Sequence, residues 1–257
     1  MFKIALGAGH YLGTPGKRTL KSLDPNETRE WVLNDRVCDK VEEKLRAYEG
    51  YELLRLDDTT GEKDTTLSER VNAANRWGAD FYLSIHHNAG IKGGSGGGIV
   101  AYSYYGSRRG AEWRDLLYDK LIEYTGLRGN RSDPLREAGY YVIKYSEAPA
   151  VLLELGFMDS KTDVPVILTD EYADRCAAAI VKAIAEREHL KKKEEADDVK
   201  RYKTLEEIPE WGRPTIEKLI ELGYLMGGSD GLGLTEDMIR MFVVNDRAGL
   251  YVKSEDK

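Results

Sequence analysis

The stretch FYLSIHHNA, residues 81–89, decides the fold, because a run of strand-forming residues ends in two histidines and an asparagine. Two other apolar runs also contain a polar side chain of a type that can take part in catalysis or metal binding. FKIALGAGH (2–10) ends at His10, and AVLLELGF (150–157) carries Glu154 in its middle. Long apolar strands that alternate with helices are typical of a parallel sheet with both faces covered. Ligands of such sheets bind at the carboxyl ends of the strands, so we expect these polar side chains to meet there.

Strand and helix patterns alternate through the first 189 residues. Apolar spacing predicts helices at 27–48, 66–77, 109–125 and 171–190. Strands are expected at 2–8, 51–56, 81–87, 98–104, 140–145 and 150–156. The fold class is therefore α/β: a three-layer sandwich with a mostly parallel sheet of about six strands between helices.

The end of the chain has a different pattern. The run KKKEEADD (191–198) has no apolar face, which predicts a charged linker or helical extension over 190–200. The resulting domain organisation is a main domain over 1–189, this linker, and a small module over 201–257.

The module is expected to be helical. One helix is predicted at 212–222, where Gly223 supplies a C-cap, and a second after Thr235, a preferred N-cap residue. So few helices make a marginal fold alone. We therefore expect the module to dock on the main domain or on a partner.

Composition excludes several classes of protein. The chain has 257 residues, is 41% hydrophobic and carries a net charge of −7. Nucleic-acid binding requires a basic stripe, and the sequence has none. No apolar run reaches the ~18 residues of a membrane span.

The chain begins directly in a strand pattern without the pattern of a signal peptide, so we expect synthesis in the cytoplasm. Cys38 and Cys176, far apart in expected helices, are predicted to be buried thiols.

Two imidazoles and a carboxylate at one sheet edge suit a hydrolytic zinc site, which takes three protein ligands and leaves one position for water. His10 supplies the first ligand. The second is His86 or His87, which point to opposite faces of their strand, so only one of them can face the site. The third is Glu30 or Glu27 at the start of the first expected helix, and spacing favours Glu30 only slightly. Manganese or cobalt would suit the same ligands.

Glu154 is the only charged residue in an apolar strand that should be buried on both faces. An isolated buried carboxylate costs several kcal/mol unless it is paired or bound to a metal. One interpretation is a carboxylate satisfied by a structural arginine. The other is a general acid/base whose pKa is tuned by a neighbouring metal for proton transfer.

Four segments in this order resemble the zinc-dependent N-acetylmuramoyl-L-alanine amidases of the type-3 family, which includes many phage endolysins. They are Gly9-His10, EWVLN (30–34), SIHHNA (84–89) and LELGF (153–157). The resemblance covers roughly residues 1–188.

The resemblance implies a role for each matching residue. It makes His10, Glu30 and His86 the zinc ligands and Glu154 the catalytic residue. His87 and Asn88 continue the same motif, and we expect them to contact the substrate.

The resemblance also implies the reaction. The expected partner is the peptidoglycan of the bacterial cell wall, and the bond cleaved is the amide between N-acetylmuramic acid and L-alanine. Without a signal peptide, the expected protein is a phage or prophage endolysin that reaches the wall after release. Two alternatives remain: a zinc peptidase that cuts peptide cross-links, and a non-catalytic wall-binding protein. Residues 211–240 faintly resemble a surface-layer-homology repeat, which implies attachment to the cell wall.

Overall fold

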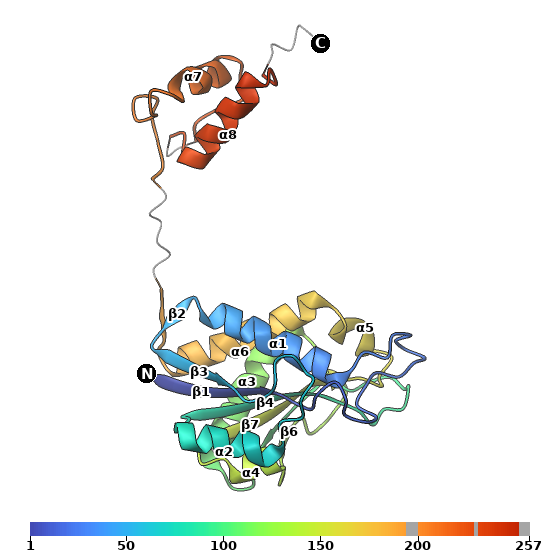
Figure 1. Cartoon of the computed structure of the whole chain (residues 1–257). Helices are drawn as coiled ribbons and strands as arrows, with labels where there is room; N and C mark the ends of the chain where they lie inside the picture. The colour runs from blue at the N-terminus through green and yellow to red at the C-terminus, as the bar shows by residue number, and fades with distance from the viewer. Residues whose placement is uncertain (194–199, 229–230, 252–257) are drawn as a thin grey trace. The chain divides into compact units, whose positions relative to one another are not determined.

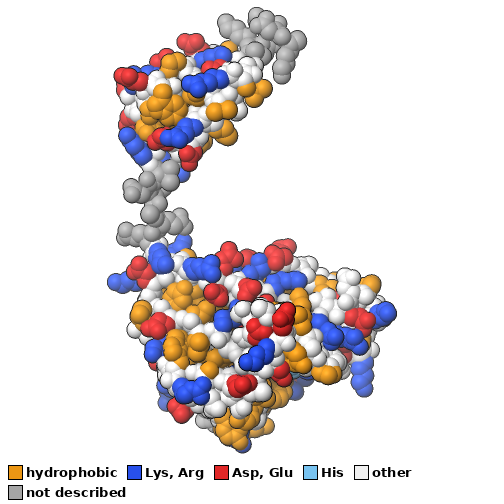
Figure 2. Space-filling model, viewed as in Figure 1, with side chains coloured by type: hydrophobic (Ala, Val, Ile, Leu, Met, Phe, Trp, Pro, Cys, Tyr) orange, Lys and Arg blue, Asp and Glu red, His pale blue; other side chains and the backbone are white. Residues whose placement is uncertain are grey.

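The computed structural model describes residues 1–193, 200–228 and 231–251 (Figure 1). The chain divides into two compact units, with the boundary after Lys193. Acidic and basic side chains are interspersed on the face of both units that Figure 2 shows. Within the described ranges, no helix is long and apolar enough to cross a membrane.

The first unit is built on a six-stranded sheet in the order β3-β1-β4-β7-β5-β6. The strands are β1 (Phe2–Ala8), β3 (Tyr51–Arg55), β4 (Phe81–Asn88), β5 (Ile99–Ser103), β6 (Leu135–Glu137) and β7 (Ala150–Phe157). Strands β3, β1, β4 and β7 are parallel to one another, whereas β5 is antiparallel to β7 and parallel to β6. The predicted mostly parallel sheet is confirmed.

Helices cover both faces of this sheet. They are α1 (Glu30–Leu45), α2 (Leu67–Trp77), α3 (Arg108–Thr125), α4 (Tyr141–Tyr145), α5 (Val164–Ile167) and α6 (Asp170–Arg187). Figure 1 shows α1 and α6 on one face and α2 and α4 on the other. Alternate residues of β4 belong to different apolar clusters: Leu83 packs with α1, α3 and α6, and Tyr82 with α2 and α4. This is the expected three-layer sandwich, and its larger cluster buries Cys38 and Cys176 as free thiols.

The ends of two helices matter for the site. Helix α2 begins with a capping box, in which Thr66 accepts from the Glu69 N–H and Glu69 accepts from the Thr66 N–H. Helix α1 begins at Glu30, three residues later than predicted, because Asp24 accepts hydrogen bonds from the N–H groups of Asn26 and Thr28. Those bonds tie the backbone of Asn26 and Thr28 to the Asp24 side chain, and the first helical residue is Glu30.

The strand predicted at 140–145 is wrong, because these residues form helix α4. Successive residues of a strand point to opposite faces. Val142 and Ile143 instead pack into the same apolar cluster, between α2 and β7, as adjacent residues of a helical turn can. The sixth strand is β6, a three-residue edge strand at Leu135–Glu137 that the sequence pattern missed.

The first unit extends into the predicted linker. Lys191–Lys192 form β8, which pairs antiparallel with β2 (Tyr48–Glu49). The rest of the charged run, residues 194–199, lies outside the described residues.

The second unit contains helices α7 (Arg213–Glu221) and α8 (Glu236–Arg247). They enclose a small apolar core of their own, made by Tyr202, Ile208, Ile216, Leu219, Leu234, Ile239 and Val243. Thr235 is the N-cap of α8, as predicted, because its hydroxyl accepts a hydrogen bond from the Met238 N–H at 3.3 Å.

Candidate metal centre

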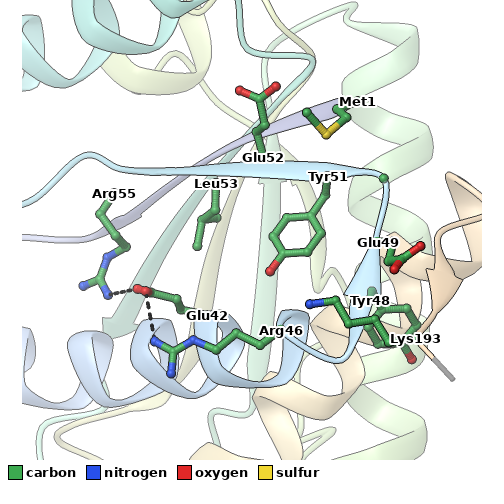
Figure 3. A pocket seen from close by; sticks show the side chains of 11 residues that line it. Met1, Glu42, Arg46, Tyr48, Glu49, Tyr51, Glu52, Leu53, Arg55 and Lys193 are labelled. Atoms are coloured by element: carbon green, nitrogen blue, oxygen red, sulfur yellow. Dashed lines mark hydrogen bonds and ion pairs between the residues drawn. The ribbon is translucent and has the colours of Figure 1, made fainter. Parts of the chain in front are cut away.

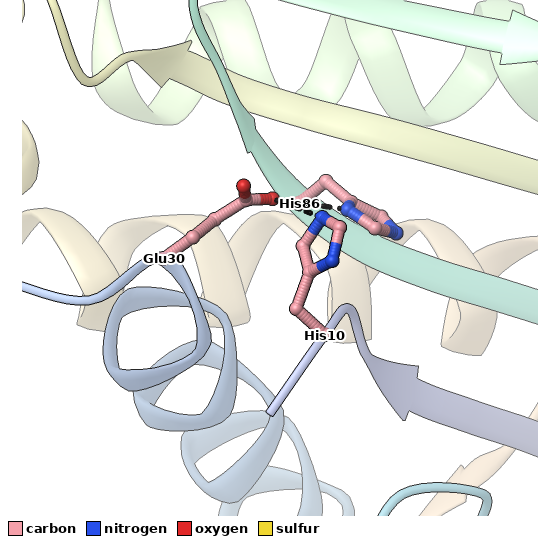
Figure 4. Close-up of side chains that lie close together, drawn as sticks. All are labelled: His10, Glu30 and His86. Carbon is pink, nitrogen blue, oxygen red and sulfur yellow. Dashed lines mark hydrogen bonds and ion pairs between the residues drawn. The ribbon is translucent and has the colours of Figure 1, made fainter. Parts of the chain in front are cut away.

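Three elements of the first unit deliver polar side chains to one point (Figure 4). His10 lies just beyond the carboxyl end of β1, His86 lies near the carboxyl end of β4, and Glu30 is the first residue of α1. Because β1 and β4 are parallel neighbours, their carboxyl ends lie at the same edge of the sheet. The expected meeting of side chains at this edge is what the structure shows.

The ligand atoms of these three residues converge closely. One nitrogen or oxygen from each of His10, Glu30 and His86 lies within 4.8 Å of the others. Glu30 Oε1 is 3.0 Å from His86 Nδ1 and 3.4 Å from His10 Nε2. The imidazole rings meet edge to face, with centroids 5.0 Å apart. Two rings and a carboxylate therefore surround one small space.

This arrangement fits a zinc ion. Bonds of about 2.0–2.2 Å in tetrahedral geometry separate neighbouring ligand atoms by about 3.3 Å. The 3.0 and 3.4 Å separations around Glu30 Oε1 lie close to that value. Both histidine side chains remain partly exposed, whereas Glu30 is 1% exposed. The open side of the site is thus on the histidine side, where water and a substrate can enter.

Glu30 has the electrostatic environment of a cation ligand. Burial alone would raise its pKa, but hydrogen bonds and charge from His10 and His86 outweigh burial and bring the pKa far below its usual range. Its other oxygen, Oε2, is buried without a hydrogen bond, and Lys17 Nζ lies 3.4 Å from it. A buried, ionised carboxylate is costly unless cationic charge accompanies it.

The two alternatives that spacing left open lie elsewhere. Glu27 forms an ion pair with Arg18 at 3.4 Å. His87 points to the other side of β4, is 2% exposed, and has its Nδ1 2.8 Å from Asn34 Oδ1. Burial lowers the pKa of His87 to about 3, so its ring is neutral.

Substrate contact by His87 and Asn88 stays a prediction. The His87 ring would have to become exposed before it could touch a ligand. Asn88 is partly exposed, and its side-chain oxygen accepts a hydrogen bond from the Ala89 N–H at 2.8 Å. Its amide nitrogen is the group that it could offer to a substrate.

Glu154 lies beside the three-residue cluster. It is in register with His86 on the adjacent parallel strand, so the two side chains project from the same face of the sheet. Burial, and then the charge of Glu30, raise its pKa well above the usual range. Its Oε2 atom is buried without a hydrogen-bond partner, so the structural-arginine interpretation finds no support among the described residues. Glu154 is therefore a buried carboxyl group on the same face of the sheet as His86, with one oxygen that has no hydrogen-bond partner.

A cavity of about 400 Å³ opens beside the cluster. His10 and His86 form part of its wall, together with Tyr11, Arg70 and Ser84, which sequence reasoning missed. A signal existed for Arg70, because it is a charged residue on the side of α2 that also buries Val71 and Ala74.

A second pocket, of about 470 Å³, lies near the opposite edge of the sheet, where β1 and β3 begin (Figure 3). Three of its charged side chains form ion pairs with one another, since Glu42 lies 3.4 Å from Arg46 and 3.8 Å from Arg55. None of the described residues that line it is a histidine. Its chemistry therefore differs from that of the metal cluster.

The family model of the N-acetylmuramoyl-L-alanine amidases named Amidase_3 matches residues 4–186, which contain the cluster and Glu154. The chain belongs to this family.

Curated relatives of this amidase-family chain include bacterial N-acetylmuramoyl-L-alanine amidases. The sporulation-specific N-acetylmuramoyl-L-alanine amidase of Bacillus subtilis is 30% identical over 195 residues, which cover 75% of this chain and 70% of the relative. The amidase CwlM of Bacillus licheniformis is 30% identical over 133 residues, 52% of this chain and 50% of the relative. The matched region thus spans 70% of the first relative and 50% of the second.

Solved structures share the fold. The catalytic domain of the amidase CwlV from Bacillus (Paenibacillus) polymyxa var. colistinus aligns with a TM-score of 0.65 at 22% identity, covering 74% of this chain and all of that one. The catalytic domain of the CD27L endolysin, which targets Clostridia difficile, aligns with a TM-score of 0.56 at 20% identity, covering 72% and 98%. At these identities the likeness is evidence for the fold alone.

Proposed function

We propose that this protein is a zinc-dependent N-acetylmuramoyl-L-alanine amidase that hydrolyses the amide between N-acetylmuramic acid and L-alanine in peptidoglycan. The observation that carries the proposal is the convergence of His10, Glu30 and His86 within 4.8 Å, with Glu154 on the adjacent strand. Membership of the amidase family supports the choice of bond. The activities of the curated relatives point to the same substrate.

In this proposal His10, Glu30 and His86 hold the zinc ion. Zinc, when bound, supplies the Lewis acidity that lowers the pKa of water toward neutrality and polarises the scissile carbonyl. Glu154 accepts the proton of the attacking water and delivers it to the leaving amide nitrogen, which departs as the amine of L-alanine. A raised pKa suits the second half of this task, because a carboxyl group that holds its proton firmly retains it until the leaving nitrogen accepts it.

A digest of purified cell walls tests this function. Zinc-loaded protein should reduce the turbidity of the walls and release fragments whose new amino terminus is L-alanine. A new internal peptide amine would instead identify a peptidase that cuts cross-links. No loss of turbidity, with zinc bound, would identify a non-catalytic wall binder and overturn the proposal.

A second, more specific part of the proposal concerns the biological setting of the enzyme. We propose an endolysin of a phage or prophage, whose second unit attaches the enzyme to the wall as the surface-layer-homology resemblance implies. The fold shared with the CD27L catalytic domain is compatible with this setting, and the bacterial relatives are equally compatible with a host enzyme. Lysis of bacteria that express the protein together with a membrane-permeabilising holin, but not without it, is the result expected of an endolysin.

A further inference from the structure

Three side chains, those of Asp57, Asn34 and Arg70, hold the backbone of residues 8–10. Asp57 Oδ1 accepts a hydrogen bond from the Ala8 N–H at 2.9 Å, and Asn34 Nδ2 donates to the Gly9 carbonyl at 3.1 Å. The Gly9 N–H donates to the Ile85 carbonyl at 2.8 Å. The two remaining carbonyls of this segment, those of Ala8 and His10, both accept from Arg70.

Arg70 reaches this segment from α2, on the other side of the cavity. Its Nη1 donates to the Ala8 carbonyl, its Nη2 to the His10 carbonyl at 3.0 Å, and its Nε to the Thr65 carbonyl at 2.7 Å. The residue is 4% exposed, and among the described residues no carboxylate forms an ion pair with it. Its buried charge is therefore met by three backbone carbonyls, which suit the fixed fork of a guanidinium.

His10 needs such support because of its backbone conformation. Its φ is +66°, in the left-handed region that a residue with a side chain adopts only at a cost in free energy. A strained residue of this kind persists when the surrounding contacts fix it. The bond from Arg70 to the His10 carbonyl is the one that fixes the peptide group directly after the strained φ.

We propose that Arg70 is a positioning residue that sets the zinc affinity of the site by fixing His10 in its ligand conformation. This inference rests on the proposed function only for the identity of the metal. Loss of a group that orients a metal ligand through a hydrogen bond lowers the metal affinity about 10–100-fold. A lysine at this position would place a single ammonium at the end of a flexible side chain, so it could not donate hydrogen bonds to all three separated backbone carbonyls that Arg70 contacts.

The test compares zinc dissociation constants, measured by competition with a chromophoric chelator, for wild type, Arg70→Ala and Arg70→Lys. We expect both variants to bind zinc about 10–100-fold more weakly than wild type. Arg114→Ala is the matched control, because Arg114 also donates to a backbone carbonyl, that of Arg136, but at the β5–β6 edge of the sheet. Its zinc affinity should equal that of wild type. Ethylguanidinium should restore the affinity of Arg70→Ala.

Two further measurements separate a positioning role from a merely structural one. Thermal unfolding of the zinc-free proteins reports on the fold, and only variants that unfold cooperatively enter the comparison. Arg70→Lys carries the test if Arg70→Ala does not fold. A folded Arg70 variant with the wild-type zinc dissociation constant would overturn the inference, whatever its unfolding temperature. Cell-wall hydrolysis is measured separately, so a wild-type protein that binds zinc without hydrolysing peptidoglycan refutes the proposed function and leaves the role of Arg70 testable.

Discussion

Replacing Gly9 with Ala should displace His86 and weaken zinc binding. A Cβ atom built at Gly9 would lie 2.1 Å from Cε1 of the His86 ring, and within 2.4 Å of both ring nitrogens. The ring must therefore move by about 1.3 Å to reach the 3.4 Å of an ordinary contact. Metal–ligand distances tolerate deviations of only about 0.2 Å. Because the ring itself is displaced, the loss of affinity should exceed the roughly 10–100-fold that losing an orienting group costs.

The matched control is Gly139→Ala. A Cβ at Gly139 meets only Tyr105, at an ordinary 3.6 Å, so this substitution should leave the zinc dissociation constant unchanged. Chelator competition measures the affinity of both variants, and far-UV circular dichroism confirms that each is folded. If folded Gly9→Ala binds one zinc ion as tightly as wild type, the packing of His86 against Gly9 does not position the ligand, and the geometric argument for the site is wrong.

Three further predictions follow from other groups of the chain. Glu154→Gln should retain zinc, because Glu154 is not among the clustered ligands, and turnover should fall by about 10²–10⁴-fold as expected for loss of a general acid/base; near-normal turnover would make Glu154 structural. His87 has a pKa of about 3 when folded and 6.5 as its reference value, so between these pH values the unfolded chain binds a proton that the folded chain does not. The free energy of unfolding should therefore fall as the pH falls through this range, with a slope of up to about 1.4 kcal/mol per pH unit, and His87→Gln should remove that contribution in urea titrations of zinc-free protein at pH 7 and pH 5. Equal pH dependence in both proteins would contradict the burial of a neutral His87. Removal of residues 194–257 should leave hydrolysis of soluble muropeptides intact and abolish co-sedimentation with cell walls, and undiminished co-sedimentation would place wall binding in the first unit.

The long apolar runs made most of the fold predictable from sequence. A strand buried on both faces has a nearly continuous apolar sequence. Strands β1, β4 and β7 can therefore be predicted from the sequence without knowledge of the tertiary structure. Short elements were not. The aromatic and β-branched residues at 140–145 favour a strand locally, but packing against α2 and β7 selects a helix. Strand β6 has only three residues, and its pairing with β5 carries no sequence signature.

The site was predictable to the extent that parallel topology brings strand ends together. His10 and Glu154 belong to runs whose ends must meet at one edge, so their proximity follows from the order of the strands. The sequence marks Arg70 only as a charged residue on the buried side of α2, and it does not show the partners of Arg70 at the site, which are backbone carbonyls far along the chain. Such bonds depend on the path of the backbone and leave no complementary charge in the sequence.

The choice between the adjacent histidines shows what only the three-dimensional arrangement can supply. Alternation along β4 states that His86 and His87 face opposite sides, but not which side holds the metal. Helix α1 decides this, because Glu30 and Asn34 lie one turn apart at its start and each contacts one histidine. The Glu30 carboxylate lies at hydrogen-bond distance from His86 and the Asn34 amide from His87. Glu30 meets His86 at the open edge, while Asn34 holds His87 in the interior and donates to the Gly9 carbonyl beside His10. The buried histidine is therefore connected to the His10 backbone through Asn34, so Asn34→Ala should disturb the His10 segment although Asn34 itself is not part of the three-residue cluster.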